Sequence, residues 1–319
     1  MMSAKYMALA LAVLLPGCTM APNYVRPEAP VAEAWPAALM PQGTVLAPAT
    51  DQLASEIGWK TFFTDQHLQR LIQLALDNNR DLRVSALNIE RARGLYQIQR
   101  ADLMPGVSAS GESSNKGVSA DLSTTGEQTV SRQHSLGVGV TSYELDFFGR
   151  IQSLKDKALE TYLGTEEAYR SARLSLVSEV AQAYLALVAD RERLNIATET
   201  LKSQQASYEM IARRHSVGVS SELDLRQAQT SVDTARVDIA RYSGQVAKDI
   251  TALSLLAGTK VTPDMLPAKA LSELPVWPAL PVSLPPTVLL QRPAILQAAH
   301  TPPAATAAHA AATAHFFPR

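Results

Sequence analysis

The sequence of 319 residues lacks several features on which many proteins depend. It has a single cysteine, Cys18, which excludes an internal disulfide. Its formal net charge is −1, so nothing in its charge favours a nucleic-acid partner. Aromatic residues make up 6% and charged residues 18%, which suits long helices better than a β-sandwich or an α/β enzyme. Beyond the N-terminal segment no 18 consecutive residues are apolar, so we expect no transmembrane helix there.

Proline is absent between Pro105 and Pro263, although the chain has 19 prolines. Inside this span, alternating residues predict a β-hairpin over 107–147, and helical patterns follow over 150–215 and 221–257. The first helix would be about 100 Å long, whereas helices of globular proteins average about 11–12 residues. The predicted fold class is mainly α with a small β part: a long antiparallel coiled-coil helical hairpin joined to a β-hairpin.

Two sets of apolar residues recur at the seven-residue spacing of a paired coiled coil. In the first helix these seam residues are Val180, Leu187, Leu194, Leu201 and Tyr208, and in the second they are Leu225, Val232, Ile239, Val246 and Leu253. Gly218 would make the reversal between the helices, Ser220 or Ser221 would cap the second helix, and Gly258 would end it. The pattern therefore predicts two helices that pair along most of their length.

The rest of the chain divides by its prolines. Residues 18–60 predict an extended strap, and residues 61–104 predict a helix in two pieces that Asn78-Asn79 separates. Thr64 and Asp81 are the predicted N-caps of those pieces. Residues 259–319 predict a Pro-rich linker with a low-complexity end over 297–315, which we expect to build no core of its own.

The N-terminus has the pattern of a lipoprotein signal. Residues 1–17 contain Lys5 and a short apolar stretch, and a Leu-Pro-Gly sequence leads directly to Cys18. A thiolate is the nucleophile that accepts a lipid as a thioether, and acyl chains then anchor the protein to a membrane. We expect lipidation at Cys18 and localisation at the cell outer membrane, since Thr19 rather than Asp follows the cysteine.

Little else in the sequence points to chemistry. Glu144 and Asp146 share a strand face, but no His or Lys base accompanies them, so polar positions before a helix are the better interpretation. His300, His309 and His315 match no metal-ligand spacing. No phosphate-binding loop, nucleophile elbow or dinucleotide fingerprint occurs. We therefore predict no enzyme, no cofactor and no metal.

Several segments resemble one family, the outer-membrane factors, which are TolC-like efflux channel lipoproteins of the NodT type. The most specific is a strand-to-helix signature that includes Glu144, Leu145, Asp146, Gly149 and Arg150. Val217, Gly218 and Val219, followed by Leu223 and Asp224, resemble the periplasmic hairpin tip that contacts an adaptor protein. Further similar segments are 21–28, 76–82 and 289–295.

The resemblance implies a homotrimer in which each subunit adds β-hairpins to an outer-membrane barrel and helical hairpins to a periplasmic tunnel. It implies a periplasmic adaptor protein, an inner-membrane RND transporter and outer-membrane lipid as partners. Drugs or other small toxic compounds would pass through the channel passively.

The sequence departs from the family pattern in its last segment. A second repeat opens at residues 289–295 and the chain stops after Phe316-Phe317-Pro318-Arg319. Three such subunits would supply six strands, fewer than the eight of the smallest barrels. We therefore expect a truncated member, with residues 61–258 as its first repeat and 259–319 as an incomplete start of the second.

Two functions remain open from the residues alone. One is the outer-membrane channel subunit of a tripartite efflux pump. The other is a lipid-anchored periplasmic coiled-coil scaffold or adaptor whose hairpin never enters the membrane. Residues 107–147 distinguish them, since a barrel needs an apolar outer face about 25 Å tall with aromatic residues at its ends.

Overall fold

The computed structural model describes residues 21–28, 30–31, 57–124, 126–267, 270–275 and 286–318. It divides into two compact units, and each combines segments that are far apart in sequence. Unit 1 takes Met1–Glu28, Ile89–Glu166 and Gln297–Arg319, and unit 2 takes Ala29–Asn88 and Glu167–Leu296. Two long helices each contribute to both units. The lipidation residue Cys18, the signal 1–17 and most of the strap 18–60 lie outside the described residues.

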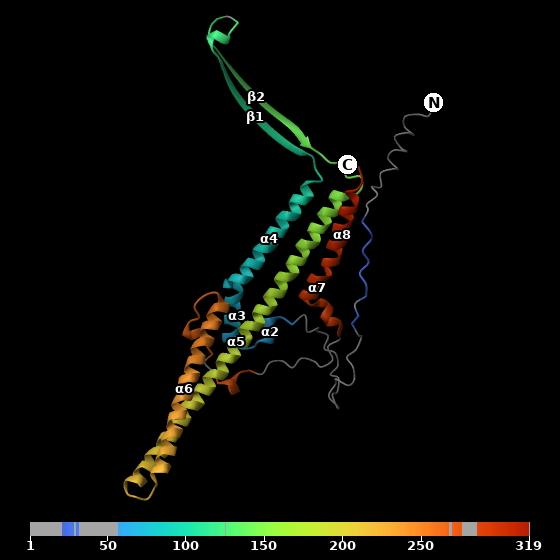
Figure 1. The fold of residues 1–319 in the computed structure, drawn as a ribbon. Helices are drawn as coiled ribbons and strands as arrows, with labels where there is room; N and C mark the ends of the chain where they lie inside the picture. The colour runs from blue at the N-terminus through green and yellow to red at the C-terminus, as the bar shows by residue number, and fades with distance from the viewer. Residues whose placement is uncertain are drawn as a thin grey trace. The chain divides into compact units, whose positions relative to one another are not determined.

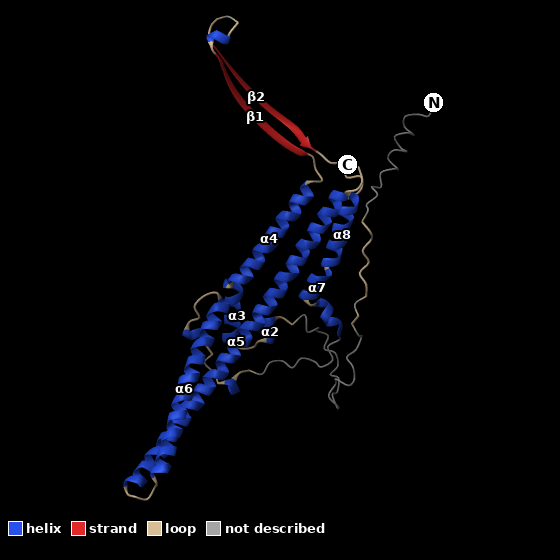
Figure 2. Ribbon diagram, viewed as in Figure 1, coloured by secondary structure: helices blue, strands red, loops and turns tan. Residues whose placement is uncertain are grey.

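The described chain is mainly helical with one antiparallel β-hairpin, which confirms the predicted fold class (Figure 2). The α-helices are α2 (Trp59–Phe62), α3 (Gln66–Asn78), α4 (Arg80–Ala101), α5 (Arg150–Ser216), α6 (Glu222–Ala257), α7 (Pro293–Ala299) and α8 (Thr301–Ala314). The strands are β1 (Gly106–Val118) and β2 (Thr129–Ser142). Short 3-10 helices are η3 (Ala120–Leu122), η4 (Pro263–Met265), η5 (Leu271–Glu273) and η6 (Pro286–Gln291).

Unit 2 has a core of large apolar side chains between α3, α5 and α6. Its fully buried members come from all three helices: Leu68, Leu71, Ile72, Val180, Tyr184, Leu187, Val188 and Leu253. Asp65 caps α3 by accepting a hydrogen bond from the backbone N–H of Leu68 at 2.9 Å, so the prediction of Thr64 was off by one residue. The buried hydroxyl of Tyr184 donates to the same carboxylate at 3.3 Å, which ties the α3 cap to α5.

The break between α3 and α4 packs against the end of α6. Asn79 caps α4 by accepting from the N–H of Leu82 at 2.8 Å, a role that we had assigned to Asp81. Its amide donates to the Leu256 carbonyl at 2.9 Å. Gly258 ends α6 with φ 67°, and a Cβ there would lie 2.2 Å from the Asn78 carbonyl oxygen. Only glycine meets both the left-handed conformation and this close approach.

In unit 2 the helices α5 and α6 run side by side to a reversal at residues 217–221 (Figure 1). Every predicted seam residue is buried or half-buried, and Val180, Leu187, Val232 and Leu253 are almost fully buried. The heptad pattern thus faces protein rather than solvent. One window of α5 is long and apolar enough to cross a membrane by length and composition alone, a test that buried core helices also pass, and 39% of this window is buried within the protein.

The β-hairpin of unit 1 has two chemically different faces. The register pairs Val107 with Val140, Ala109 with Val138 and Gly111 with Leu136, so these residues share an apolar face. The intervening residues Ser108, Ser110 and Glu112, with their partners, form a polar face. Both faces are exposed in the described chain, with Leu136 at 93% and Val138 at 78%. An isolated two-stranded hairpin is at best marginally stable in water, so this one needs other surroundings.

Most of the low-complexity end of the chain forms a helix that the sequence had not predicted. In unit 1, α8 buries a face of small residues: Ala307, Ala310, Ala311 and Ala314. The ring of His300 lies 2.7 Å from the Glu160 carboxylate of α5, and its Cβ lies 3.5 Å from the position of a Cβ on Gly164. Alanine favours helix and allows close packing, so this composition builds an interface despite its lack of large apolar side chains.

Candidate functional site: the strand-to-helix junction and the hairpin tip

The junction between β2 and α5 begins with a carboxylate that caps the helix. Asp146 accepts from the backbone N–H groups of Arg150 at 2.6 Å and Gln152 at 2.8 Å. These N–H groups have no partner within the helix, and their positive dipole end attracts a carboxylate. The Asp146 side chain therefore fixes where a helix of 67 residues starts.

Arg150 and Glu144 close the junction with a second set of bonds. The guanidinium donates from Nε to Oε1 at 2.9 Å and from Nη2 to Oε2 at 2.6 Å, a two-point ion pair. The hydrogen bond with Glu144 raises the pKa of Arg150, so the guanidinium stays charged. Lysine could not reproduce this geometry, because its ammonium lacks the planar fork.

Glycine and phenylalanine complete the turn. Gly149 has φ 73°, a left-handed conformation that a side chain would strain. The ring of Phe148 stacks on Phe317, with centroids 4.8 Å apart, so the residues after α8 pack against the junction. The Leu145 side chain is 55% exposed, and its carbonyl accepts a hydrogen bond from the N–H of Phe147 at 3.0 Å. The sequence did not indicate the roles of Gln152 and Phe317, because a backbone N–H and a long-range stacking partner leave no local pattern.

These contacts argue against acid–base chemistry at the paired carboxylates. Asp146 is committed to the helix cap and Glu144 to an ion pair with Arg150. The three polar side chains Glu144, Asp146 and Arg150 act together as a rigid connection between a strand and a helix. What this arrangement can do is hold the direction of β2 fixed with respect to the first turn of α5.

The hairpin tip lies at the other end of α5, where the chain reverses into α6. Gly218 has φ 76°, and the N–H of Val219 donates to the Arg214 carbonyl at 2.9 Å. Ser221 and Asp224 then form a capping box: the Asp224 N–H donates to the Ser221 hydroxyl at 3.1 Å, and the Ser221 N–H donates to the Asp224 carboxylate at 3.0 Å. The hydrogen bond from Ser221 holds the pKa of Asp224 below its usual range.

The side chains that the tip presents are apolar and strongly exposed. Val217 is 73%, Val219 75% and Leu223 66% exposed, while the polar groups of the turn bond with one another. A polar contact bridges the two helices behind them, since His215 Nε2 lies 3.2 Å from the Glu222 carboxylate. A turn whose polar groups are hydrogen-bonded to one another and whose valines are exposed is suited to contact another protein.

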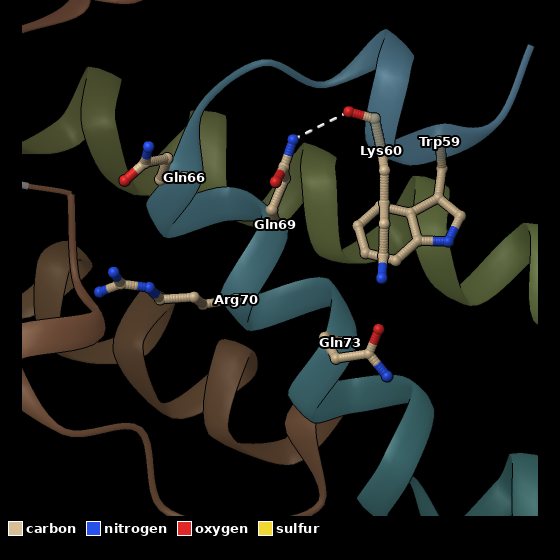
Figure 3. A pocket seen from close by; sticks show the side chains of 6 residues that line it. All are labelled: Trp59, Lys60, Gln66, Gln69, Arg70 and Gln73. Carbon is tan, nitrogen blue, oxygen red and sulfur yellow. Dashed lines mark hydrogen bonds between the residues drawn. The ribbon is translucent and has the colours of Figure 1, made fainter.

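A shallow cleft of about 330 Å³ lies elsewhere in unit 2, between α2 and α3 (Figure 3). Trp59, Lys60, Gln66, Gln69, Arg70 and Gln73 line it. The Lys60 ammonium sits 5.3 Å from the centre of the Trp59 ring and covers its open face, and the Gln69 amide is bonded to the carbonyls of Lys60 and Phe63. None of the sequence-predicted site residues lies in this cleft. Within the described ranges, no three His, Cys, Asp or Glu side chains gather as metal ligands would.

The comparisons with known proteins agree with this geometry. The model of the family described as outer membrane efflux protein matches residues 71–259, so the chain belongs to that family. The efflux pump outer membrane protein TtgC of Pseudomonas putida is 45% identical over 325 aligned residues, which cover 99% of this chain. The chain spans 65% of the length of TtgC.

Solved structures show the same fold. A membrane protein from Pseudomonas aeruginosa superposes with a TM-score of 0.77 at 38% identity, over 94% of this chain and 66% of that one. The outer membrane channel MtrE of Neisseria gonorrhoeae, in its open state, superposes with a TM-score of 0.75 at 32% identity. The match covers 94% of this chain and 64% of that one. These likenesses confirm the family that the junction and tip motifs had indicated.

Proposed function

We propose that this chain is an outer-membrane channel subunit of a tripartite RND-type efflux pump, through which drugs or other small toxic compounds leave the cell passively. In this proposal the chain is anchored in the outer membrane through lipid on Cys18 and extends into the periplasm. Its partners are two further copies of itself, a periplasmic adaptor and an inner-membrane transporter. Family membership and the names of TtgC and MtrE support the proposal.

The observation that carries it is the hairpin with its two exposed faces. The apolar face of Val107, Ala109, Val138, Val140 and Leu136 suits lipid, and the polar face suits a water-filled lumen. The junction of Asp146 and Arg150 then joins this hairpin rigidly to α5. A strand that faces lipid and continues into a long paired helix is what a channel wall that extends into the periplasm requires.

Unsatisfied edges favour assembly with further copies. Among the described residues β1 and β2 pair only with each other, so each has an edge whose backbone groups lack a strand partner. Open strand edges are not tolerated in lipid, and strands of neighbouring subunits would close them. Exposed apolar residues along α4 extend the surface that such neighbours would cover: Val84, Leu87, Leu95 and Ile98.

The hairpin tip is the surface that we assign to the adaptor. Val217, Gly218, Val219, Leu223 and Asp224 would contact it, with the three exposed apolar side chains as its centre. Asp224 serves the contact by holding the turn, since its carboxylate already accepts bonds from Ser220 and Ser221.

A pair of matched substitutions tests the channel. Val138→Asp places a charge on the apolar face, where a charge at the membrane midplane costs about 2–4 kcal/mol for basic residues and less for acidic ones. Ser110→Asp places the same charge on the polar face. In cells that lack their own outer-membrane efflux protein, ethidium accumulation should stay low with the wild type and Ser110→Asp and rise with Val138→Asp. Equal accumulation with and without the wild-type chain would refute export by this chain.

One observation favours the second candidate, a lipid-anchored periplasmic scaffold or adaptor. The uninterrupted apolar band covers five residues on each strand, about 17 Å, before Ser113 and His134 follow on the same face, whereas barrel bands are about 25 Å tall. Extraction of a Cys18→Ala variant separates the two functions. A scaffold that lacks its acyl chains would be lost from the membrane fraction. A channel subunit would stay inserted through its strands.

A further inference from the structure

Two aspartates meet inside the paired helices of unit 2. Asp190 of α5 is only 7% exposed, and its carboxyl contacts that of Asp249 on α6. The pair lies beside the apolar core, near the fully buried Leu187 and Leu253. Two ionised carboxylates in such a place repel each other, and burial removes the water that would separate their charges.

The bonds around the pair leave one oxygen without a donor. Oδ1 of Asp190 accepts from Arg193 at 2.6 Å, and Oδ1 of Asp249 accepts from the Gln245 amide at 2.9 Å. Oδ2 of Asp249 is shielded from solvent and has no hydrogen-bond partner among the described residues. A buried, unpartnered oxygen is rare in native proteins and calls for a physical reason. A proton on this oxygen supplies the reason, because the resulting O–H can donate to Asp190.

The neighbouring charges agree with a proton on Asp249. Arg193 neutralises Asp190 directly, whereas the groups that act on Asp249 are the Gln245 amide and Asp190 itself. The Arg191 guanidinium donates to the Pro267 carbonyl, and Lys248 is exposed. Burial, and then the contact with Asp190, raise the pKa of Asp249 above its ordinary value.

We propose that Asp190 and Asp249 form a proton-binding site in which Oδ2 of Asp249 carries a proton shared with Asp190. The proton stabilises the pairing of α5 and α6, and its release weakens that pairing. The direction follows from linkage. A group whose pKa is higher in the folded protein than in the unfolded chain contributes its full stabilisation at pH values below its pKa in the unfolded chain. That stabilisation is lost as the pH rises through the pKa of the group in the folded protein. The helix pair is therefore firmer in acidic surroundings.

The substitution Asp249→Asn tests the site, because an amide NH₂ can donate to Asp190 at every pH while its oxygen still accepts from Gln245. Thermal unfolding of the full purified chain between pH 4 and pH 8 is followed by circular dichroism. The variant should match the wild type near pH 4 and melt about 2–4 °C higher at pH 8. Hydrogen exchange in peptides over residues 242–253 should slow in the variant at pH 8 and not at pH 4.

Asp233→Asn is the matched control, since Asp233 lies on the same helix, is more than half exposed and pairs with Arg236 on the surface. It should shift the melting temperature by the same small amount at both pH values. The proposal is overturned if Asp249→Asn melts lower than the wild type at pH 8, or if its difference from the wild type does not change with pH. The first result would mean that the ionised Asp249 stabilises the helix pair, and the second that Asp249 releases no proton between pH 4 and pH 8.

Discussion

Unit 2 and unit 1 achieve packing in opposite ways. Unit 2 buries large side chains, such as Leu187 and Tyr184, between three helices. The buried apolar residues of unit 1 are mainly alanines, and its β-hairpin exposes both faces. Hydrophobic stabilisation grows with the apolar area removed from water, so unit 2 can be stable through its own core. Unit 1 leaves a large part of that stabilisation to surroundings, which in our proposal are lipid and neighbouring subunits.

The largest expected effect tests the self-sufficiency of unit 2. Leu187→Ala removes a side chain with no exposed surface and should lower the free energy of unfolding by about 2–5 kcal/mol. Leu136→Ala removes the same atoms from a hairpin residue that is 93% exposed. It should change the free energy of unfolding by less than about 0.5 kcal/mol. Urea unfolding followed by circular dichroism measures both. A similar loss in the two variants would contradict the contrast between the units.

The next effect probes the alanine packing of unit 1. Ala310 is fully buried, so Ala310→Leu should overpack α8 and destabilise it by about 1–3 kcal/mol. Ala312→Leu adds the same atoms at an exposed position of the same helix and should be close to neutral. Limited proteolysis, read by mass spectrometry of the fragments from residues 293–318, would report loosening of α8. If Ala310→Leu resists cleavage as the control does, α8 is not closely packed.

The smallest expected effect concerns the polar bond within the core of unit 2. Tyr184→Phe removes the hydroxyl that donates to Asp65 and should cost about 1 kcal/mol at pH 8. Burial raises the pKa of Tyr184, so the neutral phenol favours the folded state. The stabilisation by the neutral phenol is present at pH values below the ordinary tyrosine pKa of about 10, and it declines at higher pH.

The advantage of the wild type over Tyr184→Phe should therefore shrink between pH 8 and pH 11, as urea midpoints would show. Tyr143→Phe is the control, because Tyr143 is 51% exposed, and it should follow the wild type across the whole range. A constant difference between Tyr184→Phe and the wild type would mean that the phenol does not titrate with folding.

Local and periodic features of the fold could be predicted well. The seven-residue seams predicted two paired helices, and the seam residues are buried or half-buried as a pair requires. Gly218 and Gly258 occupy left-handed positions, and Ser221 caps α6, because each of these roles depends on a few adjacent residues. The caps of α3 and α4 were displaced by one or two residues, since Asp65 and Asn79 are also held by Tyr184 and Leu256 from distant helices.

The candidate sites divide in the same way. Glu144, Asp146 and Arg150 are close in sequence, so their motif could be recognised, but the helix cap and the two-point ion pair became visible only in three dimensions. The stacking of Phe148 on Phe317 and the contact of Asp190 with Asp249 join residues far apart in the chain. No local pattern could have indicated them.

The order of residues along the chain was enough to predict the elements of this protein: where strands alternate, where helices run and reverse, and which family the chain belongs to. These properties follow from the spacing of side chains along one chain, which backbone geometry converts directly into faces and turns. Two features became evident from the three-dimensional arrangement alone: the alanine-rich end packs as helix, and one buried oxygen at Asp249 lacks a donor among the described residues. Those outcomes depend on which distant surfaces meet and exclude water, a matter that no single segment encodes.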